Sequence, residues 1–136
     1  MSFLIDTDLL SLLERKRVPT KLTAWVQQND GKIFLSVVSF AELQFGVDRA
    51  PAAHRAGLVA WLAETRRAFD AATEPLSEPV LVRWMQLLAD LKRANRTMTC
   101  EDSLVAATAL FHGHTVATQN TRHFEVAGVP MVNPFL

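Results

Sequence analysis

The sequence predicts an α/β protein, a three-layer α/β/α sandwich with a mostly parallel central sheet of four to five strands. Short apolar runs alternate with longer segments whose apolar residues recur at helical spacing, a pattern typical of βαβ units and parallel sheets. The 136 residues suffice for one domain with a real core but not comfortably for two. A hydrophobic fraction of 49% favours a folded chain over a disordered one. We therefore expect residues 1–136 to form a single domain.

Two strands and four helices are expected in the first half of the chain. Leu22, Trp25 and Val26 share one helical face, and the Asn-Asp-Gly sequence at 29–31 is a C-terminal helix signal. In chain order, we expect a strand at 3–5, a short helix over 9–13, a helix from 19 to 31, a strand at 33–35, and helices over 36–49 and 54–69.

The second half should complete the sheet. Leu81, Trp84 and Leu88 form the buried stripe of a long helix, and Pro130 places its strand at a sheet edge because proline donates no backbone hydrogen bond. We expect a weak strand near 69–73, a long helix from 77 to about 95, an alanine-rich helix over 101–111, a strand at 115–117 and an edge strand at 129–132. Such sheets bind ligands beyond the carboxyl ends of their strands, so the residues after each strand are candidates for chemistry.

Composition narrows the class of protein. The formal net charge is zero, so any polyanion must be held by a local patch or through metal ions. The single cysteine, Cys100, excludes a disulfide within the chain, and we expect a small, buried or half-buried thiol there. His112 and His114 flank a glycine, where a helix C-cap is expected. No apolar run approaches a membrane span or a signal peptide, so we expect a cytoplasmic protein without a membrane segment.

Acidic residues recur next to the predicted strands. Asp6 and Asp8 follow the first strand, Glu42 lies in the helix after the second, and Asp102 lies in the first turn of the alanine-rich helix. Ionised carboxylates near buried faces are costly unless they are paired, and no lysine or arginine lies at the same strand ends to serve each of them. A divalent cation would resolve this conflict, because magnesium and manganese prefer carboxylate oxygens and waters. The pattern therefore indicates a metal site.

Each acid also has a purely structural explanation. Asp8 could cap the first helix with its side-chain oxygen. Ser39 and Glu42 have the spacing of a capping box, and Thr99 with Asp102 forms a looser version. The structural explanation is reasonable for each acid alone and weaker for the set, because all of them are expected at the same edge of the sheet.

Four segments, in this order, resemble the signature segments of the PIN domain and, more narrowly, of the VapC-type toxins of bacterial toxin–antitoxin pairs. They are FLIDTDLLSLL, SVVSFAELQFGV, EDSLVAATAL and TVATQNTRHFE. The resemblance covers essentially the whole chain, and its most specific part is SLVAATAL with the acid before it. It implies a ribonuclease that uses Mg²⁺ or Mn²⁺, a cognate antitoxin that blocks the site, and a homodimer.

The resemblance can be transferred residue by residue. The three family acids fall on Asp6, Glu42 and Asp102, and Thr7 matches the hydroxyl residue that is usual after the first acid. Asp8 stands where the family more often has asparagine. We expect Asp6 and Asp102 to be direct metal ligands, with Glu42 as a ligand or as the group that orients a water or acts as general base.

The fourth segment matches the family in part. Thr118 and Asn120 fit its T-x-N pattern, and we expect them to hydrogen-bond a ligand carboxylate or the scissile phosphate. His123 replaces the acid that commonly precedes the phenylalanine, which removes one negative charge and changes the expected metal preference. Glu125 or Asp8 could partly replace the missing acid.

Contacts to RNA should come from local basic residues. Lys92, Arg93 and Arg96 precede the Asp102 segment, and residues 15–17 form a second basic cluster. A solvated helix surface is the plainer explanation of each cluster. Arg122 is the strongest single candidate, because it lies beside Asn120.

Three other functions fit parts of the pattern less well. An apolar strand followed by D-x-D is also typical of haloacid-dehalogenase-type phosphotransferases, but these need a further acid at a strand end, which TVATQN lacks. A weakened PIN domain could bind RNA or a partner without cleavage, since His123 replaces an acid. A third possibility keeps the chemistry with DNA as substrate.

Overall fold

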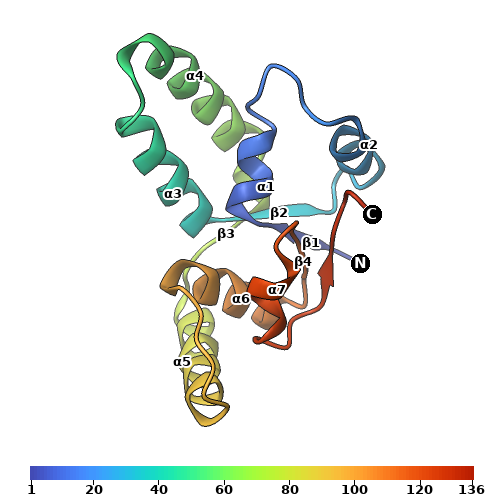
Figure 1. Cartoon of the computed structure of the whole chain (residues 1–136), viewed down its shortest axis with the longest axis vertical. Coiled ribbons are helices and arrows are strands. Elements are labelled where there is room, and N and C mark those ends of the chain that lie inside the picture. Colours follow the sequence, from blue (N-terminus) through green and yellow to red (C-terminus); the bar gives the residue numbers. More distant parts are fainter.

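The computed structural model describes residues 1–136 and contains one five-stranded, all-parallel sheet with helices on both faces (Figure 1). Its elements, in chain order, are β1 (Phe3–Ile5), α1 (Thr7–Leu12), α2 (Thr20–Gln28), β2 (Ile33–Ser36), α3 (Val37–Asp48), α4 (Ala52–Ala68), a 3₁₀ helix (Asp70–Ala72), β3 (Thr73–Glu74), α5 (Glu78–Arg93), α6 (Cys100–His112), β4 (Thr115–Ala117), α7 (Thr121–Glu125) and β5 (Met131–Val132). None of the helices has the length and apolar character needed to cross a membrane.

The sheet separates two layers of helices. In Figure 1, α1 to α4 lie above the strands and α5, α6 and α7 lie below them. Each layer has its own apolar cluster: Leu9, Leu22 and Phe40 belong to the first, and Leu87 and Val105 to the second. Because both faces of the sheet are covered, its central strands are continuous apolar runs rather than alternating ones. The predicted three-layer architecture is confirmed.

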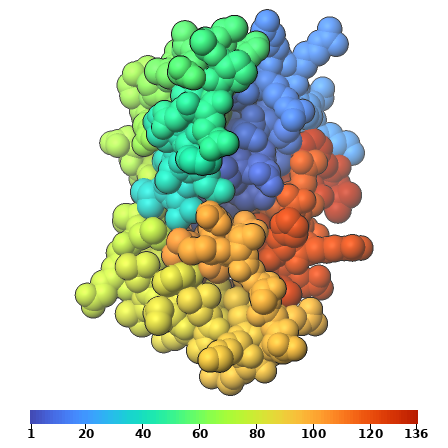
Figure 2. All heavy atoms as spheres, turned by 60° about the vertical axis from the view of Figure 1, so that its left-hand side comes forward, coloured from blue at the N-terminus to red at the C-terminus, as the bar shows by residue number.

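The strand order creates a crevice at the carboxyl edge of the sheet. The order is β3-β2-β1-β4-β5, so the chain moves outward from β1 in one direction and later continues from β1 in the other. Ile5 at the end of β1 pairs with Ala117 at the end of β4. Ligands of open parallel sheets bind at such a switch point. Figure 2 shows this side, with the start of α6 (orange) close to the starts of α1 (dark blue) and α3 (teal).

Most expected elements are present, with two differences. The weak strand near 69–73 is a 3₁₀ helix followed by the two-residue β3, because helix α4 continues to Ala68 and Phe69 is its C-cap. The five-residue helix α7 was not predicted, because one and a half turns are too short to show a periodic apolar pattern. Cys100 was expected to be buried or half-buried, but it is exposed, because it is the first residue of α6.

Two of the expected helix caps are wrong. Asp6, not Asp8, is the N-cap of α1, and its Oδ1 accepts a hydrogen bond from Leu9 N at 2.8 Å. Ser36, not Ser39, is the N-cap of α3. Ser39 lies inside the helix and is fully buried. Glu42, three residues after Ser39, is therefore not part of a capping box, so its carboxylate is available for another role.

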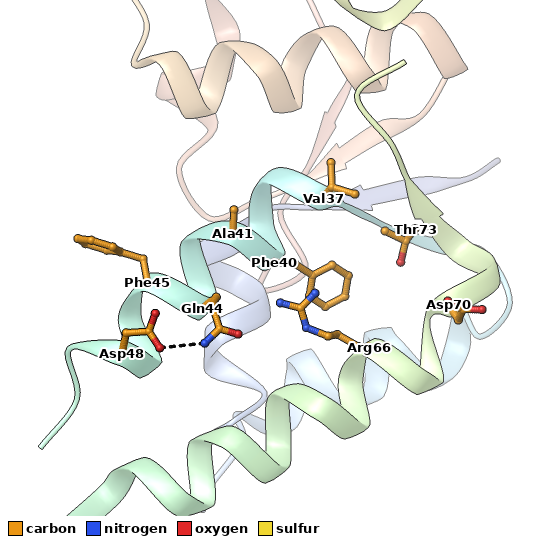
Figure 3. Close-up of a pocket in the computed structure, with 9 residues that line it drawn as sticks. All are labelled: Val37, Phe40, Ala41, Gln44, Phe45, Asp48, Arg66, Asp70 and Thr73. Carbon is orange, nitrogen blue, oxygen red and sulfur yellow. Dashed lines mark hydrogen bonds between the residues drawn. The ribbon is translucent and has the colours of Figure 1, made fainter. Parts of the chain in front are cut away.

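A cleft between α3 and α4 lies on the upper layer of the fold (Figure 3). It has a volume of about 670 Å³. The Arg66 guanidinium lies over the Phe40 ring, 5.0 Å from its centroid, and Gln44 donates to Asp48 at 3.0 Å. The cleft holds none of the predicted catalytic acids, so its size alone does not make it the reactive centre.

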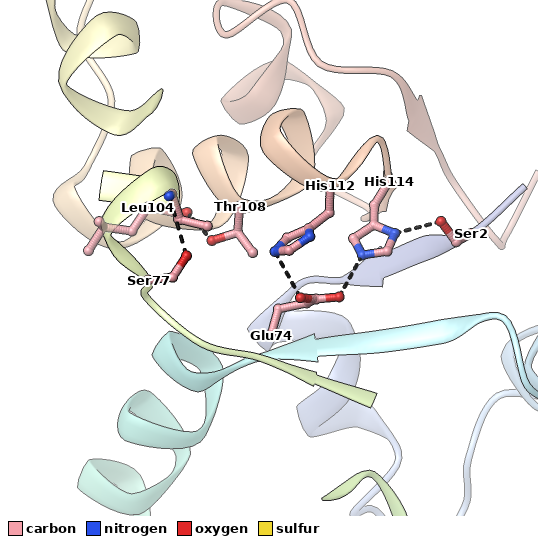
Figure 4. Close-up of polar contacts among 8 residues, drawn as sticks. Ser2, Glu74, Ser77, Leu104, Thr108, His112 and His114 are labelled. Carbon is pink, nitrogen blue, oxygen red and sulfur yellow. Dashed lines mark hydrogen bonds and ion pairs between the residues drawn. The ribbon is translucent and has the colours of Figure 1, made fainter. Parts of the chain in front are cut away.

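A second polar cluster joins β3, the end of α6 and the N-terminus (Figure 4). Glu74 bridges two imidazoles, with 2.8 Å to His112 Nε2 and 3.0 Å to His114 Nε2. Nδ1 of His114 lies 2.6 Å from Ser2 Oγ, and the His114 ring stacks on Phe34. Gly113 is the C-cap of α6, as expected. The flanking histidines have a structural role that the sequence did not predict.

We expect Glu74→Ala to lower the free energy of unfolding by about 1–3 kcal/mol, because Nε2 of the buried His114 would lose its hydrogen-bond partner. Urea denaturation at neutral pH measures this loss. Glu64→Ala, which removes an exposed carboxylate from α4, is the matched control and should change little. Equal stability of the two variants would contradict a structural role for the cluster.

Candidate active site

Asp6 and Thr118 form the centre of the crevice, at the ends of β1 and β4. Both residues are buried. The Thr118 hydroxyl donates to Asp6 Oδ2 at 2.5 Å, and Leu9 N donates to Asp6 Oδ1 at 2.8 Å. The Asp6 backbone N–H donates to the Ala117 carbonyl at 3.0 Å. The Asp6 carboxylate is therefore fixed in orientation by Thr118, which follows β4, and by the first turn of α1.

Burial dominates the electrostatics of Asp6. It raises the pKa of the Asp6 carboxyl to about 6, against an ordinary value of 3.8, although the hydrogen bonds from Thr118 and Leu9 oppose the shift. The negative charges of Asp8 and Asp102 raise this pKa further. No lysine or arginine pairs with Asp6. A buried carboxylate without a cation is a destabilising feature that a bound cation would relieve.

Glu42 faces the site from α3. Thr7 Oγ1 donates to Glu42 Oε1 at 2.7 Å and lies 2.8 Å from Ser39 Oγ. Burial raises the pKa of Glu42, and the charges of Glu101 and Asp102 add to the effect, while the Thr7 hydrogen bond opposes it. Thr7 therefore connects the first turn of α1 to the carboxylate on α3.

Asp102 enters from the first turn of α6. Thr99 is the N-cap of that helix, as predicted, and its Oγ1 accepts a hydrogen bond from Asp102 N at 3.1 Å. Burial is the largest cause that raises the pKa of Asp102; the nearby His123 lowers it, and Asp8 raises it. His123 Nδ1 lies 3.7 Å from Asp102 Oδ2.

Asn120 joins the fourth predicted segment to the first. Its Nδ2 donates to Asp8 Oδ2 at 3.1 Å, and its backbone N–H donates to Thr118 Oγ1 at 2.9 Å. Thr118 thus donates to Asp6, a carboxylate that was predicted to bind the metal, whereas Asn120 donates to Asp8, which was named only as a substitute acid. Asp8, which replaces a more usual asparagine, is held at the rim by this bond.

The donor set fits a hard divalent cation. Its side chains are the carboxylates of Asp6, Glu42 and Asp102, which come from three separate elements. Burial is the largest cause that raises the pKa of each, and the charge of Asp102 adds to the rise at Asp6 and at Glu42. No three histidine, cysteine or acidic side chains converge closely enough to coordinate one ion without rearrangement. Such a site suits magnesium or manganese, which usually retain several waters.

Of the remaining predicted residues, two lie beside Asp102 and the others lie farther from this centre. The His123 side chain is 63% exposed and touches the site only through Asp102. Arg122 lines a pocket of about 430 Å³ together with Asp102 and His123. Glu125, proposed as a substitute acid, lines a different pocket with Arg122. The basic residues at 15–17 line neither pocket.

Two residues near the site were not predicted from the sequence to belong to it. Ser39 lies 2.8 Å from the Thr7 hydroxyl, and its burial explains why its polar group needs a partner. Glu101 raises the pKa of Glu42 from the neighbouring helix. Ser39 lies on the same helical face as Glu42, and this spacing was the only signal in the sequence that it could lie near the site. The spacing alone does not distinguish a helix cap from a buried contact.

We expect Thr118→Val to lower catalytic activity about 10–100-fold, the usual cost of losing a residue that orients a ligand. The variant removes the hydroxyl that bonds Asp6 Oδ2, so the pKa of Asp6 should rise further. The acidic limb of the pH–rate profile should therefore move to higher pH. Thr118→Ser, which keeps the hydroxyl, is the control and should retain the original limb.

The fold and the carboxylate crevice together define a class, and comparison with known proteins identifies it. The PIN domain family model matches residues 3–129. Among curated relatives, the VapC ribonuclease Y4jK of Sinorhizobium fredii is 30% identical over 96% of both chains, and Toxin FitB of Neisseria gonorrhoeae is 28% identical over 97% of both. This chain therefore belongs to the PIN domain family and, within it, to the VapC toxins.

Solved structures agree with this assignment. The crystal structure of FitAcB from Neisseria gonorrhoeae matches with a TM-score of 0.87 and 29% identity, covering 98% of both chains. The DNA-bound VapBC from Salmonella typhimurium matches with a TM-score of 0.88 and 20% identity, also over 98% of both chains. At that lower identity the second match supports the fold alone.

Proposed function

We propose that this protein is a metal-dependent endoribonuclease and the toxin of a toxin–antitoxin pair. The observation that supports it best is the set of three carboxylates, Asp6, Glu42 and Asp102, with raised pKa values and no lysine or arginine partner in the crevice. The ribonuclease activity of the VapC relative gives the substrate class.

Each polar residue has a role in this proposal. Asp6, Asp102 and Glu42 would hold Mg²⁺ or Mn²⁺, which supplies an activated water and charge stabilisation at the phosphate when bound. Thr118 and the Leu9 N–H keep Asp6 oriented. Glu42, whose pKa is raised and whose other oxygen is free of Thr7, is suited to accept a proton from the attacking water.

Protein partners form the second half of the proposal. The structural relatives include toxin–antitoxin complexes, so we propose a cognate antitoxin and a homodimer for this chain. Large apolar side chains remain exposed on four helices: Phe45 on α3, Val59 on α4, Leu81, Val82 and Met85 on α5, and Phe111 on α6. Light scattering after size-exclusion chromatography tests the dimer, and a monomeric mass at micromolar concentration would contradict it.

Cleavage of RNA by the purified chain, free of antitoxin, tests the enzymatic proposal. Total cellular RNA and defined structured RNAs are incubated with Mg²⁺, with Mn²⁺ and with EDTA. We expect cleavage with either metal and none with EDTA. Cleavage that persists in EDTA would exclude the metal mechanism, and binding of RNA without cleavage under every condition would support the weakened PIN domain instead.

A further inference from the structure

A groove leads away from the carboxylates on the α7 side of the crevice. Two adjoining pockets form it: one of about 430 Å³ contains Asp102 and His123, and the next, of about 570 Å³, contains Arg96 and Glu125. Arg122 and Val126 line both pockets, so the two pockets lie next to each other. The groove therefore connects the proposed reactive centre to the turn between α5 and α6.

The two arginines along this groove have no partner within the protein. Arg96 and Arg122 are exposed and take part in no ion pair or side-chain hydrogen bond. By contrast, Arg93, only three residues before Arg96, pairs with Asp90. Glu125 shares the pocket but binds neither guanidinium. Two free guanidiniums in a groove are available for an anionic ligand, and guanidinium geometry suits phosphate in particular.

The backbone fixes where Arg96 lies. Helix α5 ends in a Schellman motif, in which Arg96 N donates to Leu91 O at 2.9 Å and Asn95 N donates to Lys92 O at 3.1 Å. Asn95 adopts the left-handed conformation that this motif requires, with φ of 54°. The turn is therefore a defined hydrogen-bonded structure, which holds the Arg96 backbone in place at the groove.

We propose that Arg122 and Arg96 form a two-phosphate track that holds one flank of the RNA strand. This inference rests on the proposed function, which places the scissile phosphate at the carboxylates. Arg122 then contacts the nearer phosphate of the flank, and Arg96 contacts a phosphate farther along the strand. The protein has no net charge, so in this proposal it binds the RNA strand through two local positive charges rather than through a positive potential over the whole surface.

Binding of single-stranded RNA as a function of salt tests the track. The measurement uses fluorescence anisotropy with labelled oligonucleotides in EDTA, so that no cleavage occurs. We expect Arg96→Ala and Arg122→Ala each to weaken binding severalfold and to reduce the slope of log K against log salt concentration by about 0.7, the value for one phosphate contact on a single strand. Arg93→Ala, which removes an equal charge from the same helix end, should leave the slope unchanged.

Oligonucleotide length separates the two positions. With a dinucleotide, Arg96→Ala should bind like the unchanged protein, whereas with a ten-nucleotide strand it should bind more weakly. Unchanged slopes for both arginine variants, or an equal loss in Arg93→Ala, would overturn the track. If the variants behave as expected but the protein cleaves no RNA with any metal, the track stands and the proposed enzymatic function fails. If cleavage occurs and the slopes do not change, only the track fails.

Discussion

Asp6→Asn should reduce metal-dependent RNA cleavage by roughly 1,000-fold or more, the scale of loss expected for a group at the centre of a catalytic site. Asparagine keeps the shape of the side chain, and its oxygen can still accept from Leu9 N. It removes the negative charge at the junction of β1 and β4, where the proposed metal ion needs an anionic oxygen. Initial rates with the most cleavable RNA, measured in Mg²⁺ and in Mn²⁺, give the size of the effect.

The interpretation depends on the variant being folded. Circular dichroism should show the unchanged secondary structure, because the substituted asparagine occupies the same N-cap position and asparagine is among the best N-cap residues. Asp30→Asn, an acid near the start of β2 and far from the crevice, is the matched control and should retain full activity. A folded Asp6→Asn protein that cleaves at the original rate would refute the assignment of Asp6 and, with it, the three-carboxylate site.

The layers of the fold could be predicted from the sequence because the helices that form them are long enough to show an apolar pattern. Helix α5 displays apolar periodicity over 16 residues, α3 is a mainly apolar segment of 12 residues, and the central strands are short, mainly apolar runs between helices. The short elements were harder to predict. β3 has two residues and α7 has five, and both depend on contacts with distant segments, such as the pairing of Leu35 with Thr73. Local pattern carries no information about those contacts.

The candidate site was predictable as a set of residues but not as a set of contacts. Strand ends converge in any parallel sheet, so Asp6, Glu42 and Asp102 could be expected near one another. Which hydroxyl serves which acid depends on side-chain directions in three dimensions. Thr7 bonds Glu42 across 35 positions of sequence, and Thr118 bonds Asp6 across 112. The capping explanation for Ser39 failed for the same reason, since its partner lies on another helix.

The raised pKa of Asp6 predicts how stability depends on pH without metal. The folded protein holds the Asp6 proton up to about pH 6, whereas an unfolded chain releases it near 3.8. The contribution of Asp6 to stability should therefore be most favourable below the lower value and should fall as the pH rises through the interval, and the full penalty from this residue should be present above pH 6. Two pKa units correspond to about 3 kcal/mol.

Asp6→Asn lacks this titration, so it should be more stable than the unchanged protein by up to about 3 kcal/mol at about pH 8 in EDTA, and the two should converge near pH 4. Urea denaturation across this range measures the difference, with Asp30→Asn following the unchanged protein throughout. Mg²⁺ or Mn²⁺ at pH 8 should narrow the gap, because a cation bound to ionised Asp6 stabilises only the folded, unsubstituted chain. A stability difference that stays constant with pH would mean that the substitution acts through packing and that the ionised Asp6 carboxylate does not destabilise the folded protein. A stability difference that varies with pH but does not change when Mg²⁺ or Mn²⁺ is added would support the buried charge of Asp6 and would contradict cation binding at this site.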